Sequence, residues 1–264
     1  MKRTYHLWIL ALMITLGSAV YQRMTGPSYP KQYVTLLDGK AIEVVLERTH
    51  GGESDHPVTV RSNNANITGK VEWKRYNTND APASIPMVMK EGILSAALPQ
   101  QPPAGKLQYT VFLTDGKQTF SASTVIRFRG DVPAPVLILH IAAMFIGMLL
   151  SARAGLEFFA KEPSFKTITY ATFIVLTIGG MILGPLVLKY AFNEWWTGFP
   201  FGTDITDNKT LIAFLAWLGA SIAVQKSTNP KRWVLGAAII TLIVFLIPHS
   251  LWGTELDYNT MKPN

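Results

Sequence analysis

The sequence predicts a membrane protein of two parts: an all-β sandwich outside the cytoplasm and an α-helical bundle within the membrane. Only 16% of the 264 residues are charged and 48% are hydrophobic, whereas average globular proteins contain about 25% charged residues. The apolar residues are also unevenly distributed. Residues 33–129 have the composition of a soluble domain, and long apolar runs dominate residues 132–252.

The N-terminal segment has the features of an export signal. Lys2 and Arg3 precede an apolar stretch over residues 7–21, an order that is typical of signal sequences. The small residues at 17–19 resemble a cleavage site, so residues 1–22 form either a cleaved signal peptide or an uncleaved anchor. We favour the signal anchor, because the chain continues beyond these small residues without a clear change in character.

Four further apolar segments predict a transmembrane four-helix bundle over residues 133–252. A helix needs roughly 20 apolar residues to cross the hydrocarbon core of a membrane, and the third segment is the shortest of the four. The predicted spans are residues 135–150 (extending as far as 159), 167–190, 211–224 and 233–251.

The loop charges predict the orientation of this bundle. Two loops are basic, and they contain Arg153, Lys161 and Lys166, and Lys226, Lys231 and Arg232. The loop of residues 193–208 between them has no Lys or Arg. Because positive loops stay in the cytoplasm, we expect the N-terminus on the cytoplasmic side of a bacterial-type plasma membrane. The sandwich and a tail of residues 253–264 are then outside.

Composition also argues against several functions. The net charge of +7 is spread over loops instead of forming one patch, so we do not expect nucleic-acid binding. The chain has no cysteine, which excludes disulfides and thiolate metal sites. We find no hydrolase, metalloprotease, P-loop or dinucleotide motif, and we therefore assign no enzymatic activity.

Short alternating segments separated by turns predict the sandwich over residues 31–130. The dipeptides Asp38-Gly39 and Asp115-Gly116 are typical of tight hairpin turns. The predicted strands are residues 41–46, 58–61, 69–76, 93–98, 107–113 and 124–128.

Two of these segments resemble fibronectin type III or immunoglobulin-like domains. Residues 71–76 (Val-Glu-Trp-Lys-Arg-Tyr) look like the third strand of that fold, and residues 98–109 look like the corner that leads into its sixth strand. The resemblance implies that Trp73 lies in the core and that the Tyr109 hydroxyl bonds back across the corner. It indicates a fold and no particular function.

The segment from His50 to His56 admits two interpretations. Its histidines, with Glu53 and Asp55, are residue types that bind metals, but a polar hairpin loop has the same composition, and we favour the loop. The segment also resembles copper-carrier domains, which use a histidine at the mature N-terminus. Here the residue after the possible cleavage site is Val20, so the resemblance fails at that position and we assign no metal.

His140 and His249 lie within the predicted bundle, where ionisable residues are functional candidates by default. The predicted topology places both in the outer leaflet. Two facing imidazoles in a helix bundle can hold a haem b, and small residues nearby would let the ring approach. Tight packing of helices in a membrane would also require these small residues. If no haem is bound, the histidines either have a structural role or handle protons.

The acidic loop of residues 193–208 is rich in aromatic residues, which suit a membrane interface. It is also a candidate lid or docking surface, and its site residues are Glu194, Trp195, Trp196, Phe199, Phe201 and Asp204. We expect Thr206 or Asp207 to cap the helix that follows.

Two local features of the bundle complete the prediction. Arg153 and Glu157 are four residues apart and should form an ion pair at the membrane border. Pro185, beside Gly184, should kink the second bundle helix.

Three functional classes remain. The first, which we favour, is an accessory or structural subunit of an envelope membrane complex, in which the sandwich binds other membrane or envelope proteins. The second is a small membrane cytochrome b or quinone-linked electron carrier with haem between His140 and His249. The third is a metal- or solute-handling membrane protein.

Overall fold

The computed structural model describes residues 2–160, 165–249, 251 and 253–263. Lys161, expected in a basic loop, and Trp252, the expected end of the bundle, lie outside these residues. The chain forms two compact units. The helical unit comprises residues 1–27 and 132–253, and the sandwich unit comprises residues 28–131 and 254–264.

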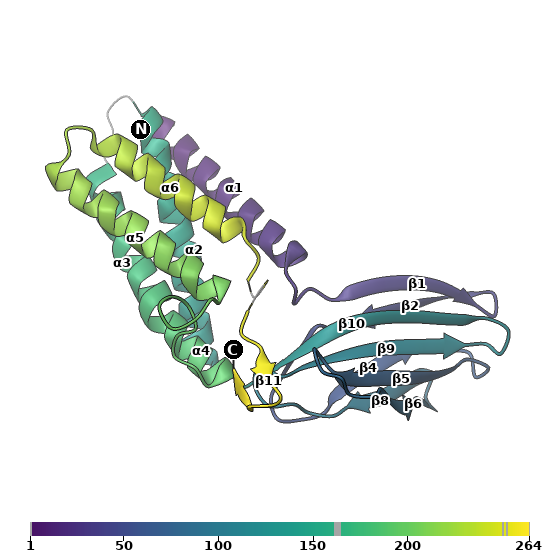
Figure 1. Ribbon diagram of the computed structural model, residues 1–264. Coiled ribbons are helices and arrows are strands. Elements are labelled where there is room, and N and C mark those ends of the chain that lie inside the picture. The colour runs from purple at the N-terminus through teal and green to yellow at the C-terminus, as the bar shows by residue number, and fades with distance from the viewer. Residues whose placement is uncertain (1, 161–164, 250, 252, 264) are drawn as a thin grey trace. The chain divides into compact units, whose positions relative to one another are not determined.

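The helical unit is a bundle in which the helices run alongside one another (Figure 1). The third long helix of the unit runs without a break through three segments, and the middle segment is π-helical. The elements are α1 (Lys2–Thr25), α2 (Ala134–Leu156) with a 3₁₀ turn (Glu157–Phe159), α3 (Phe165–Leu176), the π-helical segment (Thr177–Leu183), α4 (Gly184–Phe192), α5 (Ile205–Lys226) and α6 (Pro230–Leu246).

Three of the described helical segments are long and apolar enough to cross a membrane: Tyr5–Thr25, Ala134–Phe159 and Phe165–Phe192. These segments agree with the predicted membrane character of the chain. Helix α6 has only 17 residues, about 26 Å of helix, and α5 begins and ends with polar residues. Membrane crossing by these two helices stays a prediction.

Small residues let the bundle helices approach closely. A Cβ at Gly147 would lie 2.5 Å from a Leu176 methyl group, and one at Gly155 would lie 2.6 Å from Ala238 Cβ. A neighbouring helix already fills the space at both glycines. Close helix packing, and not a flat cofactor, therefore accounts for these two positions.

The helix that contains Pro185 departs from regular geometry before it reaches the proline. The π-helical turns of Thr177–Leu183 precede Gly184 and Pro185. A π-helical segment interrupts the regular hydrogen-bond ladder and is frequent at functional sites. The irregularity therefore begins about two turns before the residue from which we predicted it.

The pair of Arg153 and Glu157 forms as predicted, but in a buried place. Arg153 Nη2 lies 2.5 Å from Glu157 Oε1, and the side chains are only 3% and 6% exposed. The Arg153 guanidinium also lies 5.4 Å from the Trp8 ring centre. Trp8 of α1 therefore contributes to the burial of this pair, which is not an exposed surface ion pair.

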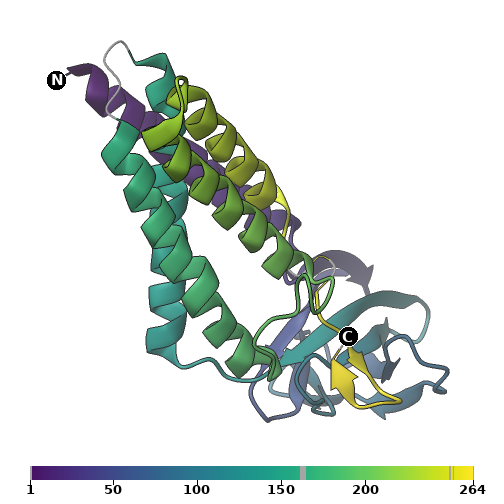
Figure 2. The ribbon, with the colours of Figure 1, turned by 60° about the vertical axis from the view of Figure 1, so that its left-hand side comes forward.

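The sandwich unit contains two layers of mostly antiparallel strands (Figure 1, Figure 2). One layer has the strand order β3-β10-β9-β5-β6 and the other has β4-β8-β7, and the hairpin β1-β2 forms a separate two-stranded sheet beside them. The strands are β1 (Lys31–Leu37), β2 (Lys40–Leu46), β3 (Thr49–Gly51), β4 (His56–Arg61), β5 (Thr68–Arg75), β6 (Ala83–Pro86), β7 (Val88–Lys90), β8 (Ile93–Leu98), β9 (Lys106–Thr114) and β10 (Thr119–Arg129).

All six predicted strands form, with ends that differ by a few residues. The predictions missed β1, β3, β6 and β7, which are short or lack a clear alternation. Asp38 and Gly39 adopt φ values of 49° and 69°, as a two-residue hairpin turn requires.

Both layers contribute to one core. Val58 and Leu94 from one layer pack with Val71 and Val111 from the other, and Trp73 packs against the same cluster while partly buried. These alternating inward residues explain why the period-two pattern was readable in the sequence.

The C-terminal segment belongs to the sandwich unit. Residues 254–263 include the short strands β11 (Leu256–Asp257) and β12 (Lys262–Pro263). Leu256 N donates to Ala104 O at 3.1 Å, and Tyr258 Oη donates to Lys106 O at 2.9 Å. The predicted separate tail is therefore a packed part of the sandwich.

Candidate functional site

The loop of residues 193–204 is anchored to the first turn of α5. Asp204 caps this helix, because its Oδ1 accepts a hydrogen bond from Thr206 N at 2.7 Å. Asp207 Oδ2 accepts bonds from Thr197 N at 2.7 Å and Thr197 Oγ1 at 3.0 Å. The capping residue is thus Asp204 and not Thr206 or Asp207, and Asp207 holds the loop instead.

Three further contacts fix the tip of this loop. Asn208 Oδ1 accepts a bond from Phe199 N at 2.7 Å, and Trp196 Nε1 donates to Phe199 O at 3.0 Å. Gly198 packs so tightly that a Cβ there would lie 2.7 Å from Asp207 Cβ. The loop is therefore held largely by side chains of the helix that follows it.

The aromatic rings of the loop are exposed on the helical unit. Phe199 and Phe201 are 69% and 83% exposed, and Trp195 is also exposed. Glu194 is half-buried, as is Trp196. Exposed rings on an anchored loop suit a membrane interface or a protein contact.

A second polar group lies where α6 ends. Lys209 is 3% exposed, and its Nζ donates to Ile247 O at 2.7 Å. Gln22 Nε2 of α1 donates to Phe245 O at 2.5 Å and to Ile247 O at 3.2 Å. The last carbonyls of a helix have no partner within the helix and carry partial negative charge. These two side chains therefore cap α6 from two neighbouring helices.

The side chain of His140 also donates a hydrogen bond to a backbone carbonyl, here in the π-helical segment. Its Nδ1 lies 2.9 Å from Gly179 O, so Nδ1 carries the proton and donates to that carbonyl. The neutral ring then has its lone pair on Nε2. Gly184 lies beside the ring, with His140 Cε1 3.9 Å from the position of a Cβ.

His249 lies three residues beyond the end of α6 at Leu246 and is exposed. Its electrostatic neighbours include Lys209, His140 and Asp204. The helical unit thus brings both predicted histidines and Asp204 into one polar region. Lys209 and Gln22 join it, although neither residue stands out in the sequence.

In the sandwich, His50 and His56 form a pair. Their Nδ1 atoms are 3.2 Å apart, and the ring centres are 4.9 Å apart. His50 Nε2 lies 2.9 Å from Ser54 O. Burial, and then the neighbouring His50, lower the pKa of His56 to about 4. The polar loop between them is therefore more ordered than its composition indicates.

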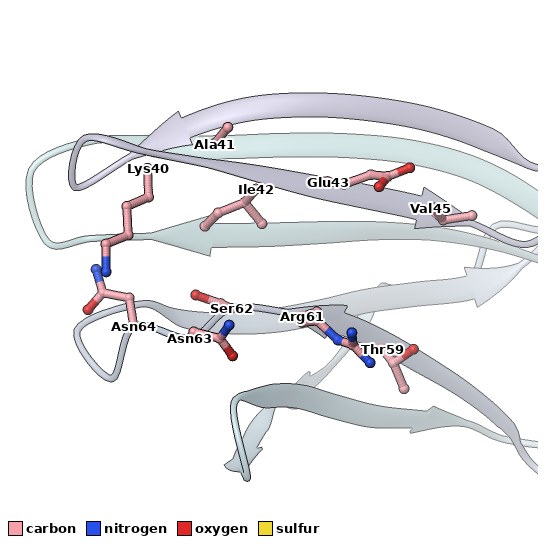
Figure 3. Close-up of a pocket in the computed structure, with 10 residues that line it drawn as sticks. All are labelled: Lys40, Ala41, Ile42, Glu43, Val45, Thr59, Arg61, Ser62, Asn63 and Asn64. Atoms are coloured by element: carbon pink, nitrogen blue, oxygen red, sulfur yellow. The ribbon is translucent and has the colours of Figure 1, made fainter.

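The sandwich also has an open groove of about 580 Å³ between β2 and β4. Figure 3 shows β2 on one side and β4, with the turn after it, on the other. These strands belong to different hydrogen-bonded groups, so their facing edges are not joined to each other in a ladder. The residues lining the groove are Lys40, Ala41, Ile42, Glu43, Val45, Thr59, Arg61, Ser62, Asn63 and Asn64.

The chain matches no known protein family model and no curated protein. In the part of the chain that the structure describes, no three His, Asp or Glu side chains are grouped so that they could hold one metal ion. The geometry of the groove, of the histidines and of the polar region is therefore the basis for a function.

Proposed function

We propose that this protein is an integral membrane accessory subunit of an envelope complex, in which the β-sandwich is the interaction module. The observation that carries the proposal is the groove between β2 and β4, because unpaired strand edges are sites where another chain can add as a strand. A relation of the sandwich to fibronectin type III or immunoglobulin-like domains is part of this proposal. The Tyr109 hydroxyl does not support it: Tyr109 Oη donates to Glu47 O, just after β2, at 2.9 Å and not across the corner of residues 98–109, as the resemblance implied.

The partner is an extended protein segment. Pro57 of β4 has no N–H to donate, which suits an unpaired edge better than the ladder with β8. Backbone groups of alternate residues point to the same edge, so Thr59 and Arg61 share this edge with Pro57. Lys40 and Arg61 add two positive charges against the one negative charge of Glu43. We infer that the bound segment has an acidic side chain at this end.

The proposed topology has the sandwich outside and the N-terminus in the cytoplasm. Residues 28–131 and 254–264 belong to one unit, so the chain must cross the membrane an even number of times between residues 131 and 254. Helix α2 and the segment Phe165–Phe192 are long and apolar enough for two of these crossings. Helices α5 and α6 then either both cross or both stay on one side, and the basic loop between them favours crossing.

Site-specific crosslinking in native membranes tests the interaction module. Because the chain has no cysteine, Thr59→Cys places a single thiol at the groove, and Ser84→Cys places one on β6 in the other layer. We expect a photo-crosslinker on the thiol of Thr59→Cys to capture one protein through an extended segment.

The variants of this experiment provide its controls. The same crosslinker on the thiol of Ser84→Cys should miss that protein, and adding Arg61→Glu to Thr59→Cys should weaken the product. Equal capture from both positions, or capture of lipid alone, contradicts the proposal.

A second candidate function is haem-linked electron transfer, and a specific observation favours it. The hydrogen bond to Gly179 O orients the His140 ring and leaves Nε2 unprotonated, with its lone pair available to a ligand. Metal-binding histidines are commonly oriented in this way. His249 is an electrostatic neighbour of His140 and would be the second ligand. Two imidazoles are ligands that suit a bis-imidazole haem, whose chemistry would be one-electron transfer. Against it, His249 is exposed and glycines near His140 pack against neighbouring side chains, so this candidate ranks below the first.

The absorption spectrum of the detergent-purified protein tests this candidate. Haem ligation by both histidines predicts a Soret band in the wild type that shifts or disappears in His140→Ala and in His249→Ala. Absence of haem from protein made with sufficient haem supply, or a band unchanged in both variants, rejects it.

A further inference from the structure

The histidine pair of the sandwich is held rigidly from both sides. His50 lies in β3, where it pairs with Phe128 of β10, and its ring packs edge-on against Phe128 with ring centres 5.5 Å apart. His56 lies in β4, paired with Leu98 of β8, and is buried. Side chains on two paired strands keep their geometry better than side chains on a free loop.

The hydrogen bonds of His50 decide where its lone pair points. Ser54 O can only accept, so His50 Nε2, at 2.9 Å, carries the proton. In the neutral ring, Nδ1 then has the lone pair, and this atom faces His56 Nδ1 at 3.2 Å. A carbonyl that fixes the far nitrogen of an imidazole is the usual outer contact of a metal-binding histidine.

We propose that His50 and His56 bind a divalent late transition-metal ion, such as Zn²⁺ or Cu²⁺, through their two Nδ1 atoms. Two Zn–N bonds of about 2.0 Å at a tetrahedral angle place the nitrogens about 3.3 Å apart. The observed separation is 3.2 Å, so the ion needs no rearrangement of the strands. The two rings already approach each other as closely as a metal chelate requires.

The chemistry of the pair sets the class of ion. Imidazole nitrogens suit Zn²⁺, Cu²⁺ and Ni²⁺, whereas Mg²⁺ and Ca²⁺ prefer oxygen ligands. Within the described residues the protein supplies two ligands, since no group of three His, Asp or Glu could hold one ion. Water fills the other positions. The bound ion is therefore readily removed by a chelator and has positions open for a ligand from outside.

A direct hydrogen bond between the two rings also fits a separation of 3.2 Å, and metal titration distinguishes the two arrangements. The full-length protein in detergent is treated with EDTA, exchanged into buffer and titrated calorimetrically with ZnCl₂ at a pH of about 7.5, where neutral imidazoles bind metal. We expect a Zn²⁺ site in the wild type that weakens at least tenfold in His50→Gln and in His56→Gln. A parallel titration with MgCl₂ should give no binding.

His6→Ala is the matched control, because it removes a histidine that lies in α1, far from β3 and β4 in the sequence. It should bind Zn²⁺ like the wild type. Replacement of His56 can disturb folding, because this side chain is buried. Circular dichroism therefore checks the fold of each variant. His50 is only half-buried, so His50→Gln tests the site even if His56→Gln does not fold.

A Zn²⁺-dependent rise in the unfolding temperature of the wild type, lost in folded His50→Gln, supports the site, because an ion joining β3 to β4 stabilises only the folded state. Equal Zn²⁺ affinity in the wild type and folded His50→Gln overturns the proposal. Absence of Zn²⁺ binding by the wild type overturns it as well. Neither result bears on the groove, whose crosslinking test does not involve metal.

Discussion

Several polar side chains of the helical unit donate to backbone carbonyls at a helix end or in an irregular part of a helix. Lys209 donates to Ile247 O just beyond α6, and His140 donates to Gly179 O in the π-helical segment. Gly179 O also accepts the backbone N–H of Gly184, so His140 adds a second bond there. Lys209 is 3% exposed, and an unpaired cation is costly in an apolar bundle, so Ile247 O stabilises it. The polar region is thus built from helix ends and a helix irregularity.

These pairings explain which site residues the sequence could predict. Histidines in apolar runs stand out, so His140 and His249 were candidates from the sequence, and their role as cofactor ligands stays a prediction. Gln22 and Lys209 were missed because each lies at the end of an apolar stretch, where a polar residue needs no explanation. Their partners are carbonyls, which no side-chain pattern shows.

At the residue scale, His56 makes stability depend on pH. The pKa of His56 is lowered to about 4, below the usual value near 6.5, so the unfolded chain takes up a proton more readily. This contribution is complete above a pH of about 6.5 and is lost as the pH falls towards about 4. The loss should be on the order of 3 kcal/mol, which is the free energy that corresponds to a pKa lowered from about 6.5 to about 4.

Urea unfolding in detergent between about pH 7 and about pH 4 measures this dependence. His56→Gln should flatten the stability curve in that interval, whereas His6→Ala should keep the wild-type slope. An unchanged slope in His56→Gln would assign the pH dependence to other groups. Carboxylates such as Asp115, whose pKa is lowered to about 2 by backbone hydrogen bonds, act at lower pH.

At the element scale, the anchored loop depends on a glycine that has no room for a side chain. Gly198→Ala places a methyl group 2.7 Å from Asp207 Cβ and should destabilise the helical unit by about 1–3 kcal/mol, the usual cost of overpacking. Gly236→Ala in α6 is the control, because nothing lies within 4 Å of its Cβ position. It should be neutral or stabilising.

Thermal unfolding in detergent measures both glycine variants. We expect a lower midpoint for Gly198→Ala and an unchanged or higher midpoint for Gly236→Ala. Equal midpoints for the two variants would show that the loop between α4 and α5 can shift without cost.

Helix α1 should remain attached as a membrane anchor. It is continuous from Lys2 to Thr25, and a stripe of small residues (Ala11, Thr15 and Ser18) is buried. Cleavage after Ala19 would cut this helix and remove that stripe. Intact-mass spectrometry of the protein purified from membranes should show the uncleaved chain, and a mass beginning at Val20 would contradict this.

At the scale of the whole molecule, the absence of cysteine gives a direct test of orientation. A single thiol from Ser84→Cys in the sandwich should react in intact cells with a maleimide that cannot cross membranes. A thiol from Thr228→Cys, in the basic loop between α5 and α6, should react only after permeabilisation. Labelling of Thr228→Cys in intact cells would reverse the proposed topology or exclude crossing by α5 and α6.

The two-part architecture could be predicted from the sequence because both of its signals extend over several residues. These signals are the alternation of apolar and polar residues in β2, β4 and β9, and the long apolar runs in α2 and α3. The short strands β3, β6 and β7 have too few residues to show a period. The C-terminal segment was predicted as a tail because Leu256 and Tyr258 form no pattern of their own. Their places are set by Ala104 and Lys106, which lie far earlier in the chain.

That C-terminal segment also constrains how the protein is made. The sandwich receives Leu256 and Tyr258 only after α6 has left the ribosome, so its last contacts form after the helical unit has been synthesised. In the proposed topology, a chain whose later helices insert wrongly would leave these residues on the wrong side of the membrane and the sandwich incomplete. We therefore expect such a chain to be more sensitive to proteases than the correctly inserted one.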